Sequence, residues 1–397
     1  MSTVAKSSKP VGIEVSLAIA EAVKLAEAEV IAAYPITPQT HIVEHLSDIV
    51  ANGELDAEYV PVESEHSAMS ACVGSSAAGA RTFTATSSQG LMLMAEIVFI
   101  APMMRLPIVM AVANRAISGP INIWNDHSDT MSIRDCGWIQ VFVENGQEAT
   151  DMSIISFRIA EDKNVMMPFM LNLDGFTLSH FIEPIVFPDQ EEVRKYLPPY
   201  ETTHKLDITK PLSMGLLGAP EVYTESKKAT DDALLASKKH IVKAFDEFGK
   251  QFGRQYNLVE TYKADDADTI IVTMGSISET AMVAIDEMRA EGEKVGLVRI
   301  RLWRPFPVEE FRAAIKNAKN LAVVDRHIIS GFPEGPVATE VRALMYHEEN
   351  RPRISNFVLG LGGRDVPRNH FKYVVERTKE LGTTGRQGHY EMVGVME

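Results

Sequence analysis

The spacing of apolar residues in the first 180 positions alternates between a helical and a strand-like pattern. Over residues 15–26 apolar side chains recur every three or four positions, while Glu14, Glu21 and Lys24 face away, as in a helix packed on a core. Continuous apolar or β-branched runs predict buried strands at 30–34, 58–62, 82–86 and 106–113. The stretches between them predict helices at 39–51, 65–79 and 91–100. This alternation indicates an α/β fold with a parallel sheet covered by helices on both faces.

A second α/β pattern begins near Asp265, after a proline-rich segment and a charged helical segment. Residues 184–220 are proline-rich and irregular, which predicts an ordered arm, and 229–257 resembles a charged amphipathic helix. Beyond the arm, strands are expected at 269–274, 294–300, 321–324 and 356–359, with a helix at 279–291. A chain of 397 residues is too long for one ordinary core. We therefore expect two domains, residues 1–255 and a smaller one at 256–397.

Charge and cysteine content narrow the possible functions. A net charge of −15 and a pI near 5.3 argue against binding to nucleic acid or to an anionic membrane. Two cysteines, Cys72 and Cys136, cannot hold a [4Fe-4S] cluster, which requires four thiolates, and Cys72 is expected to be a small buried residue. Residues 1–10 lack the apolar core of a signal peptide, and no stretch is apolar enough to span a membrane. A cytoplasmic chain is expected.

Three polar side chains lie where ligands of parallel sheets bind, beyond the carboxyl ends of the strands. Glu65 marks a strand-to-helix transition, where the helix dipole favours a carboxylate, although a simple helix-start acid would look the same. Arg115 follows a buried strand and is suited to gripping a carboxylate with two hydrogen bonds. The alternative for Arg115 is a structural salt bridge with Asp126 or Asp129. Thr37 offers a hydroxyl at the first strand end, or serves only to form the turn.

Motifs for metals and nucleotides are missing from the sequence. His66 and His127 have no partners at metal-ligand spacing, so no metal site is predicted in this chain. Neither of the glycine-rich fingerprints of dinucleotide and nucleoside triphosphate sites occurs. One glycine-rich segment, 360–365, follows a predicted strand, a setting in which such loops can approach phosphate.

Five short motifs occur in one order along the chain. They are Tyr34-Pro35-Ile36-Thr37-Pro38, Glu63-Ser64-Glu65-His66, Thr86-Ser87-Ser88-Gln89-Gly90, Asn114-Arg115-Ala116 and Ile121-Asn122-Ile123-Trp124-Asn125-Asp126-His127. Together they resemble the α subunits of pyruvate:ferredoxin oxidoreductases (pyruvate synthases), within the 2-oxoacid:ferredoxin oxidoreductase family. Two later segments resemble the second domain of the same subunits, Arg304-Pro305-Phe306-Pro307 and Gly360-Leu361-Gly362-Gly363-Arg364-Asp365. The resemblance spans nearly the whole chain.

The resemblance implies a fold and a set of site residues. The first domain would be the pyrimidine-binding domain of thiamine diphosphate enzymes, and the second a transketolase C-terminal-like domain. Glu65 matches the glutamate that hydrogen-bonds N1′ of the cofactor, whereas Thr37 and Arg115 match the residues that hold the 2-oxoacid. The other positions expected at the cofactor are Pro35, Ile36, Ser88 and Gln89.

The resemblance also implies partners. The family catalyses the reversible, coenzyme A-dependent oxidative decarboxylation of pyruvate to acetyl-CoA and carbon dioxide, with ferredoxin as electron acceptor. A β subunit would bind the diphosphate and Mg²⁺, and the β and ferredoxin-like subunits, of the γ and δ types, would hold [4Fe-4S] clusters. The two isolated cysteines of this chain agree with that division.

Several alternatives remain open at this point. A branched-chain 2-oxoacid:ferredoxin oxidoreductase shares much of the framework, whereas a 2-oxoglutarate enzyme needs a further cation. An oxalate-using relative has arginine where Thr37 stands, so Thr37 disfavours oxalate. A non-catalytic assembly scaffold would not need Glu65, Arg115 and Thr37 together. A single-chain thiamine diphosphate enzyme would carry a Gly-Asp-Gly motif for the diphosphate, which is missing here. The resemblance leads us to expect a glycine-rich segment at this point of the second domain, but residues 329–336 contain fewer glycines than expected.

Overall fold

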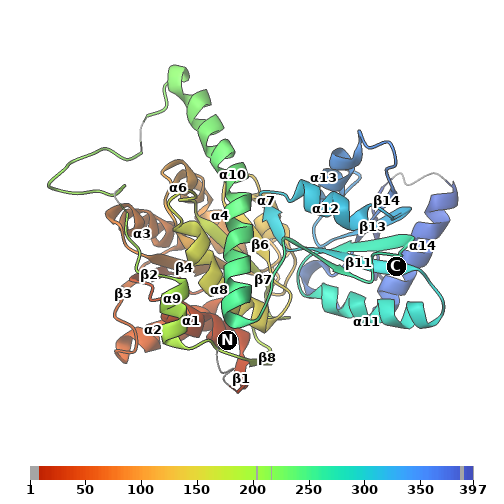
Figure 1. Cartoon of the computed structure of the whole chain (residues 1–397), viewed down its shortest axis with the longest axis horizontal. Coiled ribbons are helices and arrows are strands. Elements are labelled where there is room, and N and C mark those ends of the chain that lie inside the picture. Colours follow the sequence, from red (N-terminus) through yellow and green to blue (C-terminus); the bar gives the residue numbers. More distant parts are fainter. Residues whose placement is uncertain (1–8, 203, 216, 385–388, 397) are drawn as a thin grey trace.

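The computed structural model describes residues 9–202, 204–215, 217–384 and 389–396, and its largest sheet comes mainly from the first half of the chain (Figure 1). The strands of this sheet are β2 (Val30–Ala33), β3 (Glu58–Pro61), β4 (Thr82–Thr86), β5 (Val109–Asn114), β6 (Ile139–Phe142), β7 (Phe169–Asp174) and β12 (Leu302–Arg304). Their order is β12-β6-β7-β5-β4-β2-β3, and all neighbours are parallel except β12, which is antiparallel to β6. The predicted parallel sheet is confirmed.

Helices cover both faces of this sheet, and each face has its own apolar core. One core is built with α1 (Val15–Leu25), α2 (Thr40–Ala51), α8 (Gly146–Ala160), α9 (Gln190–Tyr196) and α10 (Pro220–Phe252). The other core is built with α3 (Glu65–Ala78), α4 (Ser88–Leu93), α5 (Ala95–Val98) and α6 (Ile100–Met103). The short helix α7 (Ser128–Ser132) follows β5, and a small antiparallel pair joins β1 (Val11–Glu14) to β8 (Ile182–Ile185).

A second sheet lies beside the first and contains six strands (Figure 1). In sheet order the strands are β15 (Glu391–Met392), β14 (Arg353–Val358), β13 (Asn320–Asp325), β10 (Thr269–Thr273), β11 (Val295–Ile300) and β9 (Val259–Tyr262). Only β9 runs antiparallel. The helices α11 (Ile277–Ala290) and α14 (Arg368–Thr384) share one core, and α12 (Val308–Ile315) and α13 (Pro336–Met345) share the other. A short 3₁₀ turn, η1 (Leu361–Gly363), follows β14.

Three sequence expectations differ from the structure. The helix expected at 229–257 is α10, which begins nine residues earlier, because its first turns are exposed and carry no apolar stripe. The expected irregular arm contains β8 and α9, and only its later part is extended (Figure 1). The helix expected at 91–100 is divided into α4, α5 and α6. Within the described residues, no helix combines the length and apolar composition needed to cross a membrane.

The two sheets meet at Asp174, which ends the central strand β7 and is almost fully buried. Its carboxylate lies 2.9 Å from His127 Nε2 and 3.0 Å from Arg326 Nη1, and accepts a hydrogen bond of 2.8 Å from the Ser276 backbone. Burial would raise the pKa of Asp174, but Arg326 and His127 outweigh it and hold the pKa well below its usual range. Since Ser276 and Arg326 follow strands β10 and β13, Asp174 joins the carboxyl ends of both sheets.

A second buried ion network ties β11 to the start of α8. Arg299 lies 3.1 Å from both Glu144 and Glu148, and Arg301 lies 2.6 Å from Glu148. Burial raises the pKa of Glu144 to about 7, because the Arg299 charge offsets the loss of water only in part. Glu148 has a lowered pKa, since two arginines outweigh the effect of its burial. The second sheet is therefore docked through paired charges as well as through apolar packing.

Replacing Asp174 by Asn should destabilise the chain by about 3–5 kcal/mol, because it leaves Arg326 buried without its anion. Urea unfolding at pH 7 measures the effect. The lowered pKa means that the contribution of Asp174 is present above the ordinary aspartate pKa and is lost only as the pH falls through the lowered value. The control is Asp232→Asn, which breaks an exposed pair with Lys228 and should cost less than about 1 kcal/mol. Equal losses in both variants would contradict this role of Asp174.

Candidate functional site

Glu65 is the first residue of α3, and its side chain is buried at the end of β3. The helix begins here because Ser64 adopts an extended conformation and its hydroxyl accepts a hydrogen bond of 3.2 Å from the Ser67 backbone. The carboxylate lies against the backbone of Gly90, where a β-carbon would come within 2.7 Å of Glu65 Oε1. In the described parts of the chain, no donor or cation contacts this carboxylate. A buried carboxylate without a partner is costly unless a ligand supplies one.

The turn from β4 into α4 places Ser88 and Gln89 beside Glu65. Ser88 has a positive φ of 44°, an uncommon conformation for a residue with a side chain. Its backbone donates to Asp129 Oδ2 at 3.1 Å, and its hydroxyl lies 2.7 Å from the Ala116 carbonyl and 2.6 Å from Gln89 Oε1, both acceptors. The turn is therefore fixed by groups from the segment after β5.

Arg115 directly follows β5, and only 7% of it is exposed. Its guanidinium donates to the carbonyls of Asn122, at 2.8 Å, and Thr37, at 3.0 Å, and reaches the Gln89 side chain at 3.5 Å. It forms no ion pair with Asp126, Asp129 or any other described residue. Burial lowers the pKa of Arg115, and the nearby Asp129 only partly opposes this. A buried guanidinium held by neutral acceptors is suited to binding an anion.

The loop between β2 and α2 brings Thr37 to the same place. Gln39 donates to the carbonyls of Tyr34, at 3.0 Å, and Ala85, at 2.8 Å, which ties the loop to the end of β4. The Thr37 carbonyl binds Arg115, and Thr37 itself is exposed. Pro35 and Ile36 lie in this loop, exposed and half-buried respectively. The structure thus brings every predicted site residue to one edge of the sheet.

For Asp129 the sequence suggested only a salt bridge with Arg115. In the structure its carboxylate instead connects the segments at this edge through hydrogen bonds. One carboxylate oxygen accepts from the backbones of Ser88, at 3.1 Å, and Arg115, at 3.0 Å. The other accepts from Asn114, at 2.9 Å, and from the Thr130 backbone, at 2.8 Å. Burial raises the pKa of Asp129 to about 6, although these donors oppose the shift. Nothing in the sequence shows this role, because Ser88 lies 41 positions before Asp129, and Asn114 and Arg115 lie 15 and 14 positions before it.

The second sheet also contributes to the site, through the glycine-rich turn that includes η1. The Asn122 side chain donates to the Gly362 carbonyl at 3.1 Å, and the Gly362 backbone donates to Asp126 at 3.1 Å. A β-carbon on Gly363 would lie 2.2 Å from Trp124 Cβ, so only glycine fits there. Because Asn122 also accepts from Arg115, the turn braces the loop that holds the guanidinium. The backbone N–H groups of Gly362 and Gly363 therefore both donate hydrogen bonds to this loop, to the Asp126 carboxylate and the Asn125 carbonyl.

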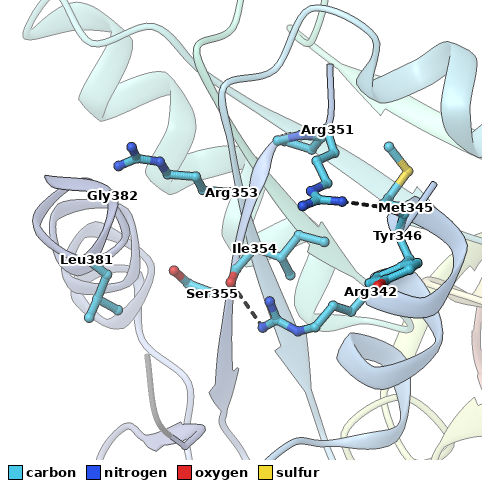
Figure 2. Close-up of a pocket in the computed structure, with 10 residues that line it drawn as sticks. Arg342, Met345, Tyr346, Arg351, Arg353, Ile354, Ser355, Leu381 and Gly382 are labelled. Atoms are coloured by element: carbon cyan, nitrogen blue, oxygen red, sulfur yellow. Dashed lines mark hydrogen bonds between the residues drawn. The ribbon is translucent and has the colours of Figure 1, made fainter. Parts of the chain in front are cut away.

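The cavity drawn in Figure 2 lies apart from this edge, between α13, β14 and α14, and has a volume of about 480 Å³. Three arginines line it, but they do not converge on one point. Arg342 donates to the Ile354 carbonyl at 3.1 Å, and Arg351 donates to the Tyr346 carbonyl at 2.6 Å. Arg353 is directed toward α14 and away from Arg351 (Figure 2). We therefore assign the functional site to the edge that carries Glu65 and Arg115.

Comparison with known proteins gives matches over most of the chain. Residues 21–246 match the family model described as pyruvate flavodoxin/ferredoxin oxidoreductase, thiamine diP-bdg, and residues 267–371 match pyruvate:ferredoxin oxidoreductase core domain II. Relatives named pyruvate synthase subunit PorA are 50% identical in Methanocaldococcus jannaschii, covering 91% of this chain and 93% of the relative, and 52% identical in Pyrococcus furiosus, covering 93% of each. A ketoisovalerate oxidoreductase subunit VorA from Pyrococcus abyssi is 43% identical, covering 93% of each chain.

Solved structures support the fold. A 2-oxoglutarate:ferredoxin oxidoreductase from Magnetococcus marinus aligns with a TM-score of 0.69 at 21% identity, over 94% of this chain and 66% of that one. A split-gene transketolase aligns with a TM-score of 0.56 at 10% identity, over 94% of this chain and all of that one. The predicted combination of a thiamine diphosphate-binding domain and a transketolase-like α/β domain is confirmed.

The close approach of Gly90 to Glu65 predicts the effect of adding a methyl group. Gly90→Ala places a β-carbon 2.6 Å from Thr86 Oγ1 and 2.7 Å from Glu65 Oε1, and should destabilise the chain by about 1–3 kcal/mol in thermal or urea unfolding. The control is Gly74→Ala in α3, where nothing lies within 4 Å, and which should be neutral or stabilising by about 0.4–1 kcal/mol. A Gly90→Ala chain as stable as wild type would show that the Glu65 side chain is not confined.

Proposed function

This chain belongs to the pyruvate:ferredoxin oxidoreductase family, and on that premise we propose that it is the subunit holding pyruvate and the pyrimidine half of thiamine diphosphate. The complete enzyme would convert pyruvate and coenzyme A to acetyl-CoA and carbon dioxide and pass the electrons to ferredoxin. The observation that carries the proposal is the pair of buried, uncompensated charges on one sheet edge, Glu65 and Arg115.

The residues around Glu65 fit an aminopyrimidine ring. The carboxylate is buried and lacks a partner among the described residues, and the missing side chain of Gly90 leaves room for the carboxylate beside the α4 backbone. Ser88 and Gln89, on the same turn, and Pro35 and Ile36, on the facing loop, would line the ring. We assign these residues to cofactor binding, with Glu65 as the hydrogen-bond partner of the pyrimidine N1′.

When bound, thiamine diphosphate supplies a nucleophilic thiazolium carbon and an electron sink for the pair released with carbon dioxide. The contribution of this chain is proton placement. Glu65, which is 6% exposed and begins helix α3, would share a proton with N1′ and so set the tautomer of the ring. A neutral amide at position 65 would keep the shape but could not exchange that proton.

Arg115 and Thr37 would position the substrate. The guanidinium is held by the Asn122 and Thr37 carbonyls, which orient it without neutralising its charge. It would bind the carboxylate of the 2-oxoacid, and the Thr37 hydroxyl would approach the keto oxygen. Holding the carboxylate in place aligns the C–C bond that breaks. Because carbon dioxide is uncharged, its interaction with Arg115 weakens once the C–C bond has broken.

The remaining parts of the reaction are assigned to partner subunits. Both cysteines of this chain are buried as free thiols, and burial raises the pKa of Cys72 and Cys136 to about 12, which disfavours the thiolate that cluster ligation requires. A β subunit would provide the diphosphate and Mg²⁺ site, and β, γ and δ subunits would hold the iron–sulfur clusters. Pyruvate is favoured as substrate because the relatives named pyruvate synthase subunit PorA are 44–52% identical, against 43% for the ketoisovalerate oxidoreductase subunit.

Replacing Glu65 by Gln should leave assembly intact but lower pyruvate decarboxylation by several orders of magnitude, because the amide cannot exchange the proton at N1′. Pyruvate-dependent reduction of ferredoxin by the reconstituted complex measures this. The control is Glu58→Gln, an exposed acid at the amino end of β3, which should retain normal activity. Turnover near that of wild type in Glu65→Gln would refute the role of Glu65.

Replacing Arg115 by Ala should lower kcat/KM for pyruvate roughly 10- to 100-fold, the loss expected when hydrogen bonds to a charged group are removed. Arg105→Ala is the matched control. Arg105 is half-buried and donates only to carbonyls, those of Met166 at 2.9 Å and Val165 at 2.5 Å, so its removal should lower stability without changing kcat/KM. If kcat/KM is unchanged in Arg115→Ala, the arginine is structural.

A further inference from the structure

Three potential metal ligands from distant parts of the chain converge near the site edge. Glu14 ends β1, His41 lies in the first turn of α2, and His180 lies in the segment between β7 and β8. One ligand atom from each side chain lies within 4.8 Å of the others. His41 Nδ1 is 2.6 Å from Glu14 Oε1, and the rings of His41 and His180 are 4.6 Å apart. His41 lies 27 positions after Glu14, and His180 lies 139 positions after His41, so no local sequence pattern indicates the cluster.

The backbone fixes this arrangement. Pairing of β1 with β8 sets Glu14 opposite Ile182, two residues beyond His180. The segment after β7 is packed closely on the loop that precedes α2, since a β-carbon on Gly175 would lie 2.5 Å from Pro38 Cγ. His41 follows Pro38 by three residues, which brings its ring to that of His180. The convergence therefore results from strand pairing and close loop packing.

The donor set is suited to a transition-metal cation. His180 Nδ1 lies 2.8 Å from the Ser179 hydroxyl, whose oxygen also accepts from the Phe176 backbone at 2.9 Å. With Nδ1–H donated to that oxygen, Nε2 of His180 presents its lone pair, the arrangement found for histidines that bind metals. Two imidazoles and a carboxylate match the donor preference of Zn²⁺.

We propose that Glu14, His41 and His180 form a binding site for one borderline divalent cation of the Zn²⁺ class, with a fourth position open to water. Ligand atoms around tetrahedral zinc lie about 3.3 Å apart for bonds of about 2.0 Å, so His41 and Glu14 need to separate by less than about 1 Å. The His41 side chain is 43% exposed and that of Glu14 20%, which leaves room for this adjustment and a route for the cation.

The site would brace the loops around Arg115. His180 packs on Phe176, with ring centres 4.5 Å apart, and Phe176 packs on Trp124 at 6.0 Å. Trp124 belongs to the loop that carries Asn122, an acceptor for the Arg115 guanidinium. A cation at Glu14, His41 and His180 would thus hold the segment after β7 against α2 and restrict this loop. Cation binding itself requires neither thiamine diphosphate nor substrate, so it stands apart from the proposed function.

Equilibrium dialysis of the untagged, full-length chain against Zn²⁺ tests the proposal, with Mg²⁺ present in excess as a competitor for hard-ligand sites. The wild-type chain should bind one Zn²⁺ tightly at these ligands and gain thermal stability from it. His41→Ala, His180→Ala and Glu14→Gln should each weaken this binding at least tenfold and abolish the gain. His41 and Glu14 are partly exposed, so these two variants keep the test valid if His180→Ala folds poorly.

The matched control is His45→Ala. His45 lies one turn further along α2 and pairs with Glu21 at 2.9 Å, the same kind of histidine–carboxylate contact but with no third ligand among the described residues. Its removal should leave tight Zn²⁺ binding unchanged. The proposal is overturned if the wild-type chain binds no Zn²⁺ under these conditions, if folded His41→Ala and Glu14→Gln chains bind as tightly as wild type, or if His45→Ala loses as much affinity as they do.

Discussion

The buried Asp174 carboxylate is the contact on which the arrangement of this molecule depends. It stands at the end of β7 in the first sheet and binds His127, Ser276 and Arg326, of which the last two follow strands of the second sheet. The carboxyl ends of the two sheets are therefore held face to face. The His127 backbone reinforces this by donating to the Arg326 carbonyl at 2.9 Å. In parallel sheets these ends carry the ligands, so the loops of both sheets serve one site.

The site itself contains charges that the chain does not neutralise. Arg115 is surrounded by carbonyls and an amide, and the Glu65 carboxylate rests on Gly90 without a donor among the described residues. Asp129 fixes both neighbourhoods by accepting from the Ser88 and Arg115 backbones. Such groups cost stability unless a ligand compensates them, and this is the usual way in which a folded site retains affinity for substrate and cofactor. The charges at Asp174 and Glu148 are paired, whereas Glu65 and Arg115 form no ion pair with any described residue.

The sequence predicted the local elements better than their assembly. Strands β2, β4 and β5 were found because they are almost wholly buried and consist mainly of apolar or β-branched residues, and their order explains why Thr37, Ser88 and Arg115 meet. The edge strand β12 was not found, since three residues give no periodic signal and its partner β6 lies some 160 positions earlier. The start of α10 was missed because the side chains of its first turns are mostly exposed and form no apolar stripe. Asp129, Asp174 and the cluster of Glu14, His41 and His180 depend on contacts between distant segments, which residue spacing cannot show.

The central claim is that this chain provides half of a thiamine diphosphate site and that partner subunits provide the rest, with every iron–sulfur cluster. The most direct measurement is the thiamine diphosphate and iron content of the complex that co-purifies with this chain. It is compared with the content of the full-length chain purified alone. The account predicts thiamine diphosphate and iron in the complex, together with small cysteine-rich partners, and a colourless, iron-free chain on its own. Iron–sulfur absorption from the isolated chain, or an active complex without thiamine diphosphate, would contradict it.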